Sequence, residues 1–355
     1  MKQLLVLTGA LSLMLACNKS KIENVDLPPA SPGSTMKVNG LVGSEPGTTA
    51  GNMVFIDLSK DKQMPLVRAS WDLAFYCGNQ NRVMINNTTA AMAVVLDKTN
   101  LDEVTAADVS GQTFEVDITD PSPSTFLKLD DLGGDLSKTV IPEIRATASK
   151  VVVIGRGTGG GTPRRDLVKA QFKLTANGEY EVKWAKIGEQ AYQTATIAKE
   201  DAYHFKYVSF DNGLLTTAEP NKFSWDIVWG TSIYQTLNGG VMAAYIFSDM
   251  VGVNYLSGVT TVEKIYNDDA AATEAFNTYS LAEAEAETFD NYRWAIGANW
   301  RRTAAPGVTD AGVDKKRFYI IKDPQGNYYK LKFLRFSAED LGTRGNPEFK
   351  YELLK

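Results

Sequence analysis

Short segments of the chain alternate between apolar and polar residues, which is typical of strands that bury one face. In residues 223–230 every second side chain is large and apolar, and residues 71–75 repeat the same spacing. A helix would instead place apolar residues three and four positions apart. The alternation therefore predicts a protein that is mainly β.

Turn and helix signals agree with this fold class. Asp323-Pro-Gln-Gly-Asn327 separates the strand-like segments 317–322 and 328–336, and its Pro and Gly favour a hairpin turn. Strong helix formers are concentrated in residues 270–288. Residues 109–148 contain several Pro and Gly and favour few regular elements. We therefore expect short helices, few in number.

The sequence contains an internal repeat. The triplet Ser-Trp-Asp occurs at 70–72 and again at 224–226, each time beside a strand-like segment. Weaker similarities follow in the same order, and they join 150–154 to 317–321, 168–172 to 329–333 and 179–182 to 348–351. The repeat predicts two tandem β-rich domains, 36–190 and 200–355. The alternative is one large β domain whose strands are similar by coincidence.

The repeat also pairs individual side chains. The pairs are Asp72 with Asp226, Asn86 with Asn238, and Met92 with Met242. Two carboxylates can hydrolyse a glycosidic bond only when they converge on one substrate. Because Asp72 and Asp226 recur at one position of a repeat, we expect each to make a structural hydrogen bond. A Met that recurs among small residues favours a core position, so we expect Met242 to be buried.

Composition excludes several kinds of site. One His and two Cys among 355 residues leave no site built from several His ligands. His204, the one imidazole, stands at the entry of a strand, where we expect a structural role. We find no convincing nucleophile–base pair, so we expect a protein that is not an enzyme. The net charge of −5 argues against nucleic acid as a partner.

The first residues predict export and a lipid anchor. Met1-Lys2 precedes an apolar run that ends at Ala16, which is typical of a secretory signal, 1–16, and is too short to span a membrane. The ending Leu13–Cys17 resembles the lipobox of bacterial lipoproteins, which implies lipidation of Cys17; the alternative is a plain cleaved signal. Residues 17–35 are polar and rich in Pro, Ser and Gly, which favours a flexible tether. We expect a protein anchored by lipid in the outer membrane, on its surface or its periplasmic face.

Four segments resemble the HmuY-like haem-binding lipoproteins. They are the opening strand 207–213, the central 221–226, the closing hairpin 317–333 and the final strand 347–353. Together they cover most of 203–355, and the first copy matches less completely through Trp71-Asp72. The resemblance implies an almost all-β fold that captures haem at the cell envelope. It also implies transfer of haem to a TonB-dependent outer-membrane receptor.

The resemblance further implies two axial haem ligands between the central strand and the closing hairpin, His in the founding type and Met in others. Residues 240–315 contain no His, and Met242 and Met250 are the two Met residues there. Thioether sulfur can ligate haem iron. We expect Met250 in a loop, where it is the better ligand candidate. Tyr255 and Tyr279 are alternative oxygen donors for the second ligand.

A haem site also needs flat apolar walls and cations for the propionates. Trp294 and Trp300 are the candidate walls, and Arg301 and Arg302 are the candidate cations. The alternative is that these Trp residues pack between sheets and the cations form a solvated rim. A second function therefore stays open: a surface binding or scaffold lipoprotein that binds a glycan or a protein and no haem.

Overall fold

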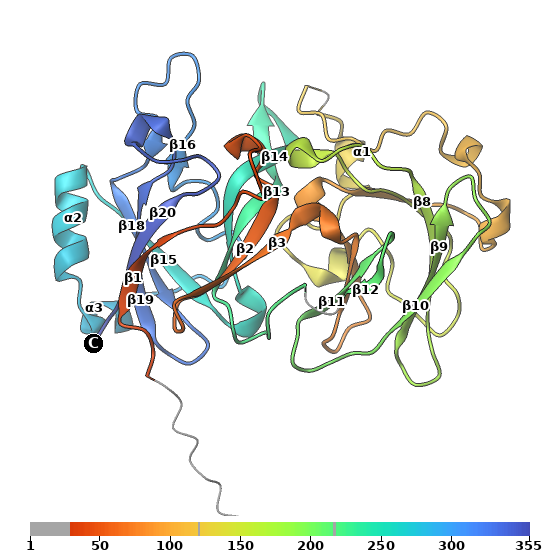
Figure 1. The fold of residues 1–355 in the computed structure, drawn as a ribbon, viewed down its shortest axis with the longest axis horizontal. Coiled ribbons are helices and arrows are strands. Elements are labelled where there is room, and N and C mark those ends of the chain that lie inside the picture. The colour runs from red at the N-terminus through yellow and green to blue at the C-terminus, as the bar shows by residue number, and fades with distance from the viewer. Residues whose placement is uncertain (1–28, 120, 216–217) are drawn as a thin grey trace, which may run out of the picture.

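The computed structural model describes residues 29–119, 121–215 and 218–355 (Figure 1). Strands make up most of its regular structure and the helices are short, so the predicted mainly β fold class is confirmed. The predicted signal peptide, Cys17 and the tether as far as residue 28 lie outside the described residues. Within the described ranges, no helix is long and apolar enough to cross a membrane.

Two antiparallel sheets form a sandwich that we name the β19 sandwich after its central strand. One sheet has the strand order β1 (Gly33–Lys37), β20 (Glu348–Leu353), β19 (Tyr328–Arg335), β18 (Arg317–Lys322) and β15 (Thr260–Ile265). The other has the order β14 (Val241–Val253), β13 (Ile227–Asn238), β2 (Asn52–Asp57) and β3 (Lys62–Val67). Buried side chains from both sheets, Trp229 and Tyr319 among them, form its core.

Two further antiparallel sheets form the β8 sandwich. One sheet has the order β10 (Gln193–Ile197), β9 (Tyr180–Lys186), β8 (Val168–Leu174), β7 (Val152–Gly155) and β6 (Met92–Val95). The other has the order β12 (Gly213–Leu215), β11 (Phe205–Ser209), β4 (Leu73–Tyr76) and β5 (Val83–Ile85). The two sandwiches lie side by side, with their four-stranded sheets facing each other (Figure 1).

Each sandwich contains strands from both repeats. The opening strand β2 of the first repeat pairs with β13 of the second, and the equivalent strand β11 of the second repeat pairs with β4 of the first. At the outer edges β1 pairs with β20, and β10 pairs with β9. The two repeats thus exchange their opening strands reciprocally within one chain. The boundaries 36–190 and 200–355 stay predictions.

Two side-chain pairs of the repeat, one of Asn residues and one of Met residues, were matched wrongly from the sequence. Asn86 donates to the carbonyls of Arg68 and Trp71, and its counterpart is Asn254, which donates to the carbonyls of Lys222 and Trp225. Asn238 instead ends β13, in a hairpin with β14 that is much longer than the β4–β5 hairpin. This extension shifted the alignment after the Ser-Trp-Asp triplet.

The same shift explains the error at Met242. Met92 lies in β6, whose partner is β7, and the equivalent pair in the second repeat is β15 with β18. Met242 stands instead near the tip of the β13–β14 hairpin, where 43% of its surface is exposed. The expectation that Met242 belongs to the core is therefore wrong.

Helices cover one face of the β19 sandwich. The predicted helical segment 270–288 forms two helices, α2 (Asp269–Thr278) and α3 (Leu281–Glu285). Ser280 caps the second helix together with Glu283, and this capping box begins a new helix after a break. The segment 109–148 contains α1 (Pro123–Phe126) and isolated turns, as expected, and β16 (Arg301–Arg302) pairs with β17 (Gly312–Val313).

Candidate ligand-binding site

The central strands of the four-stranded sheets are buried on both faces. In β2, Val54 and Ile56 enter the core of the β19 sandwich, whereas Met53 and Phe55 face the β8 sandwich. In β4, Leu73 and Phe75 enter the core of the β8 sandwich, and Ala74 faces back. The period of two along each strand therefore builds a third apolar layer between the sandwiches.

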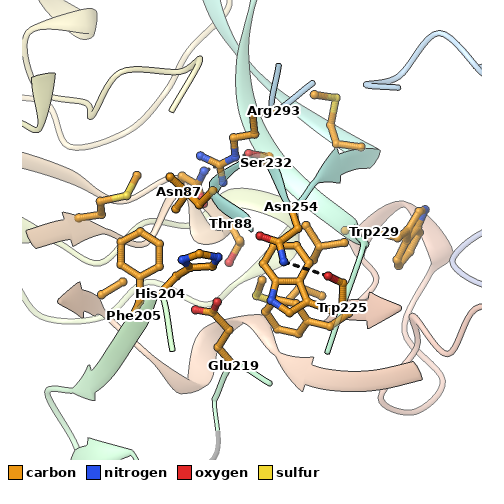
Figure 2. Close-up of a pocket in the computed structure, with 18 of the residues that line it drawn as sticks. Asn87, Thr88, His204, Phe205, Glu219, Trp225, Trp229, Ser232, Asn254 and Arg293 are labelled. Carbon is orange, nitrogen blue, oxygen red and sulfur yellow. Dashed lines mark hydrogen bonds between the residues drawn. The ribbon is translucent and has the colours of Figure 1, made fainter. Parts of the chain in front are cut away.

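This layer contains a cavity of about 100 Å³, which we name the joint cavity (Figure 2). Both repeats contribute to its walls, and most of the wall is apolar. Its aromatic side chains come from Phe55, Trp71, Phe205, Tyr207, Trp225, Trp229, Tyr255 and Trp294. The cavity therefore exists only where the two repeats meet.

Trp71 and Trp225 occupy equivalent places in its wall. Trp71 packs edge-on against Tyr207, with ring centroids 4.9 Å apart, and Trp225 packs edge-on against Phe55 at 5.0 Å. Each pair joins the Ser-Trp-Asp segment of one repeat to the opening strand of the other. Both Trp residues precede their strands and lie in the joint, so the expectation that residues 223–230 form one continuous strand face is wrong for Trp225.

Three thioethers line the cavity, from Met53, Met84 and Met250. Met250 is buried within β14 opposite Gly230 of β13, so its predicted place in a loop is wrong. A β-bulge after Gly230 and a left-handed backbone at Asp249 keep this segment in the sheet. A side chain at Gly230 would lie 3.2 Å from Met53, so Gly230 allows β2 and β13 to approach closely.

Two titratable groups of the cavity wall are buried. The Glu219 Oε2 atom accepts a hydrogen bond from the Tyr207 hydroxyl at 3.0 Å, and burial raises the pKa of Glu219 to about 8. The Nε2 atom of His204 lies 2.7 Å from the Ser257 hydroxyl. Burial, and next the charge of Lys222, lower the pKa of His204 to about 4. His204 is therefore uncharged at neutral pH.

Arg293 places a cation at the same cavity. Its guanidinium lies 4.6 Å from the ring of Trp294, and Figure 2 shows it directed toward the cavity from the side opposite Glu219. Among the described residues, the Arg293 side chain has no hydrogen-bond or ion-pair partner. The cavity thus combines apolar walls with an unpaired positive charge.

A comparison with protein families now identifies the chain. The family model described as "HmuY protein" matches residues 49–203 and 201–351. The chain belongs to the HmuY family. Comparison with curated proteins and with solved structures finds no match. The HmuY family is associated with haem binding, and its two matches meet close to His204, where the joint cavity lies.

The structure brings three of the residues predicted for this HmuY protein to the joint cavity, Met250, Trp294 and the alternative oxygen donor Tyr255. The other alternative donor, Tyr279, lies elsewhere, against Phe318, and its hydroxyl donates to Glu287 at 2.7 Å. The Nε1 atom of Trp294 donates to the carbonyl of Leu132 at 2.6 Å, which fixes the indole in the wall. Trp300 lies elsewhere, fully buried in the β19 sandwich, where it stacks on Phe333 at 4.1 Å. The indole of Trp300 therefore packs between the sheets, as the alternative interpretation predicted.

The predicted cations also lie away from the cavity. Arg301 donates to the carbonyl of Ser248 and stands 3.9 Å from the buried carboxylate of Asp249. Arg302 is exposed and pairs with Asp310. Both arginines therefore have partners away from the cavity. Met242 does not line the cavity either.

Sequence reasoning did not find Glu219, Arg293, Met53 or Met84 as site residues. They come from four separate parts of the chain and meet only through the strand exchange. Across the described ranges there is no group of three or more His, Cys, Asp or Glu side chains that could hold a metal ion. An iron ligand at this site would be a thioether, the imidazole of His204, or the phenol oxygen of Tyr207 or Tyr255.

Haem fits this site in chemistry and exceeds it in size. Thioether ligands, aromatic walls and an unpaired guanidinium suit the iron, the macrocycle and a propionate respectively. A single water molecule needs roughly 10–15 Å³ of volume measured in this way. On that scale, a cavity of about 100 Å³ is much smaller than a porphyrin. The joint has to widen before the whole macrocycle can enter.

Proposed function

We propose that this HmuY protein captures haem or a related porphyrin in the joint cavity and is not an enzyme. The observation that carries the proposal is a partly open apolar cavity, built by both HmuY repeats and lined by three thioethers. Met250 is the first candidate iron ligand, and Met53 and Met84 are alternatives on the same wall. Arg293 holds a propionate carboxylate.

The proposal includes a place in the cell. A signal peptide at 1–16 and a lipid on Cys17 anchor the protein in the outer membrane, and a TonB-dependent receptor takes the porphyrin from it. The first described strand, β1, lies at an edge of the β19 sandwich, away from the joint. An anchor that precedes β1 therefore leaves the joint free to open.

Haemin titration of the mature protein tests this proposal. We expect a saturable one-to-one shift of the Soret band, and Met250→Ala is expected to weaken binding at least tenfold. Met242→Ala is the matched control, because it removes an exposed thioether far from the cavity and should change nothing. Iron-free protoporphyrin shows how much affinity the macrocycle alone supplies. No spectral shift with ferric or ferrous haem would contradict the proposal.

A second candidate function, glycan binding, is favoured by an open groove of about 390 Å³. The groove lies between residues 126–138 and β13, and the hydroxyls of Tyr234 and Tyr292 lie 2.6 Å apart in its wall. Tyr292 is 40% exposed, and Asp131 and Lys138 add polar groups, which suits a sugar ring. Glycan-array binding that Tyr292→Ala abolishes, without any haem binding, would favour this function.

A further inference from the structure

Unpartnered polar atoms are concentrated at the joint cavity. Twelve buried side-chain nitrogen and oxygen atoms of the described residues lack a hydrogen-bond partner, and five of them belong to residues that line this cavity. These five are Nε1 of Trp71, Nε1 of Trp225, Nε1 of Trp229, Oε1 of Glu219 and Oδ1 of Asn254. A buried polar group without a partner costs free energy, so such a concentration indicates a ligand that completes the bonds.

The orientation of these groups is fixed by their other contacts. The Asn254 amide nitrogen donates to the carbonyls of Lys222 and Trp225, which turns its oxygen toward the cavity (Figure 2). Tyr207 holds one oxygen of Glu219 and leaves the other free. The Trp225 indole lies beside that free oxygen but outside hydrogen-bonding geometry. The site is therefore organised before any ligand arrives.

A buried carboxyl group and a guanidinium face the cavity from opposite sides. Figure 2 shows the Glu219 carboxyl and the Arg293 guanidinium directed toward one another across it. They form no ion pair with each other, and among the described residues neither has an ion-pair partner elsewhere. Aromatic side chains, including Trp71 and Trp225, line the same cavity. Aromatic walls attract organic cations, and a guanidinium binds carboxylates.

We propose that the joint cavity, before any widening, binds a small zwitterion, with its ammonium group at Glu219 and its carboxylate at Arg293. A cavity of about 100 Å³ admits a molecule of this size without the widening that a porphyrin needs. The free oxygens of Glu219 and Asn254 and the rings of Trp71 and Trp225 surround the ammonium group. This inference goes beyond haem capture and does not depend on it.

The protonation state of Glu219 predicts a distinctive pH dependence of ligand binding. The pKa of Glu219 is raised to about 8 because burial is not offset by any cation, and His204, with a pKa lowered to about 4, supplies none. The other titratable neighbours, Tyr207 and Cys77, have raised pKa values and are uncharged at neutral pH. An ammonium group at Glu219 favours its ionised form, so binding releases a proton below pH 8.

Isothermal titration with glycine betaine, without haem, tests the proposal. Its quaternary ammonium stays charged at every pH, so the pH dependence reports the protein. We expect one-to-one binding whose affinity rises by up to tenfold per pH unit between pH 6 and 8. Glu219→Gln should weaken binding at least tenfold and remove the pH dependence, while keeping the bond to Tyr207. Choline, which lacks the carboxylate, should bind more weakly than betaine.

Two further arms make the result decisive. Arg293→Gln should reduce betaine affinity to that of choline, whereas the matched surface variant Arg302→Gln should match the wild type. Thermal unfolding of each variant verifies that it is folded. Absence of betaine binding to the folded wild type, or binding that neither Glu219→Gln nor Arg293→Gln weakens, would overturn the proposal. Betaine binding without haem binding would contradict the proposal of haem capture and support the proposal of a zwitterion site.

Discussion

Asp72 and Asp226 each hold the opening strand of the other repeat. The Asp72 Oδ2 atom accepts a hydrogen bond from the backbone N–H of Phe210, and Asp226 Oδ2 accepts one from Leu58, both at 2.8 Å. Both carboxyls are buried and belong to different sandwiches. The expected structural role of the two Asp residues is confirmed, and the exchange of strands is reciprocal at the level of single hydrogen bonds.

The two carboxyls differ in their neighbours. Arg156, which follows β7, donates two hydrogen bonds to Asp72 at 2.8 and 2.9 Å. The residue that follows β18 in the second repeat is Asp323, which lies close enough to Asp226 to disfavour its charge. Burial is the main cause that raises the pKa of Asp226 to about 8. One repeat thus pairs its Asp with a guanidinium, whereas the other buries its Asp in the protonated form.

Asparagine at the two positions should therefore have unequal effects. Asp72→Asn removes one of the two carboxylates that pair with the buried guanidinium of Arg156, the other being Asp211, and we expect a loss of about 2 kcal/mol in the free energy of unfolding. Asp226→Asn replaces a neutral carboxyl by a neutral amide and should change it by less than about 1 kcal/mol. Urea unfolding followed by circular dichroism measures both. Equal losses would contradict the assignment of an ion-pair partner to Asp72 alone.

Stability should also decrease with rising pH because of Asp226. Its pKa is about 8 in the folded protein against an ordinary 3.8, so the folded chain retains a proton that the unfolded chain releases. The resulting stabilisation is complete below about pH 4 and is lost as pH rises through 8. Glu219 and Asp130, with pKa values raised to about 8 and about 7, act in the same direction.

The contribution of Asp226 is isolated by comparing its variant with the wild type. Between pH 5 and 8 the free energy of unfolding of the wild type should fall relative to Asp226→Asn by up to about 1.4 kcal/mol per pH unit. Urea unfolding at each pH supplies the two curves. Parallel curves would mean that Asp226 is ionised in the folded protein.

Removal of an indole N–H should have different effects at the cavity and in the core. Trp225→Phe removes an N–H that has no partner among the described residues, so the loss in stability should come only from the smaller ring. Trp300→Phe also breaks the 3.1 Å hydrogen bond to the carbonyl of Asp249 and leaves that buried oxygen unpaired. We expect the Trp300 variant to be less stable than the Trp225 variant by about 1–3 kcal/mol in urea unfolding. The reverse order would contradict the assignment of Trp225 to a ligand cavity.

The fold class and the repeat could be predicted because their signals are local. The Ser-Trp-Asp triplets, the alternation in 71–75 and the turn at 323–327 each depend on neighbouring residues. The strand exchange could not be predicted in this way. Strands β2 and β11 are equivalent, and either could pair with β4 or with β13, so the sequence pattern does not specify which sandwich each enters.

The site was harder to predict because it depends on that exchange. Met250 was placed in a loop from Ser248-Asp249, yet a bulge accommodates Asp249 and the strand continues. Trp294 and Trp300 have similar sequence surroundings, and only the tertiary fold sends one to the cavity and the other to the core. Glu219 carries no sequence signal at all, since a single Glu beside Pro is common on a surface.

The central claim is that the two repeats exchange their opening strands and so build one shared cavity, and paired cysteines test it most directly. In the protein with Cys17 replaced by Ser, we expect disulfides in Thr35→Cys with Lys350→Cys and in Thr194→Cys with Lys183→Cys, because these positions are opposite each other in β1–β20 and β10–β9. Thr35→Cys with Lys183→Cys, and Thr194→Cys with Lys350→Cys, should form none. Mass spectrometry of non-reduced peptides identifies each link. Disulfides only in the latter two variants would show that each repeat keeps its own strands, and the shared cavity would not exist.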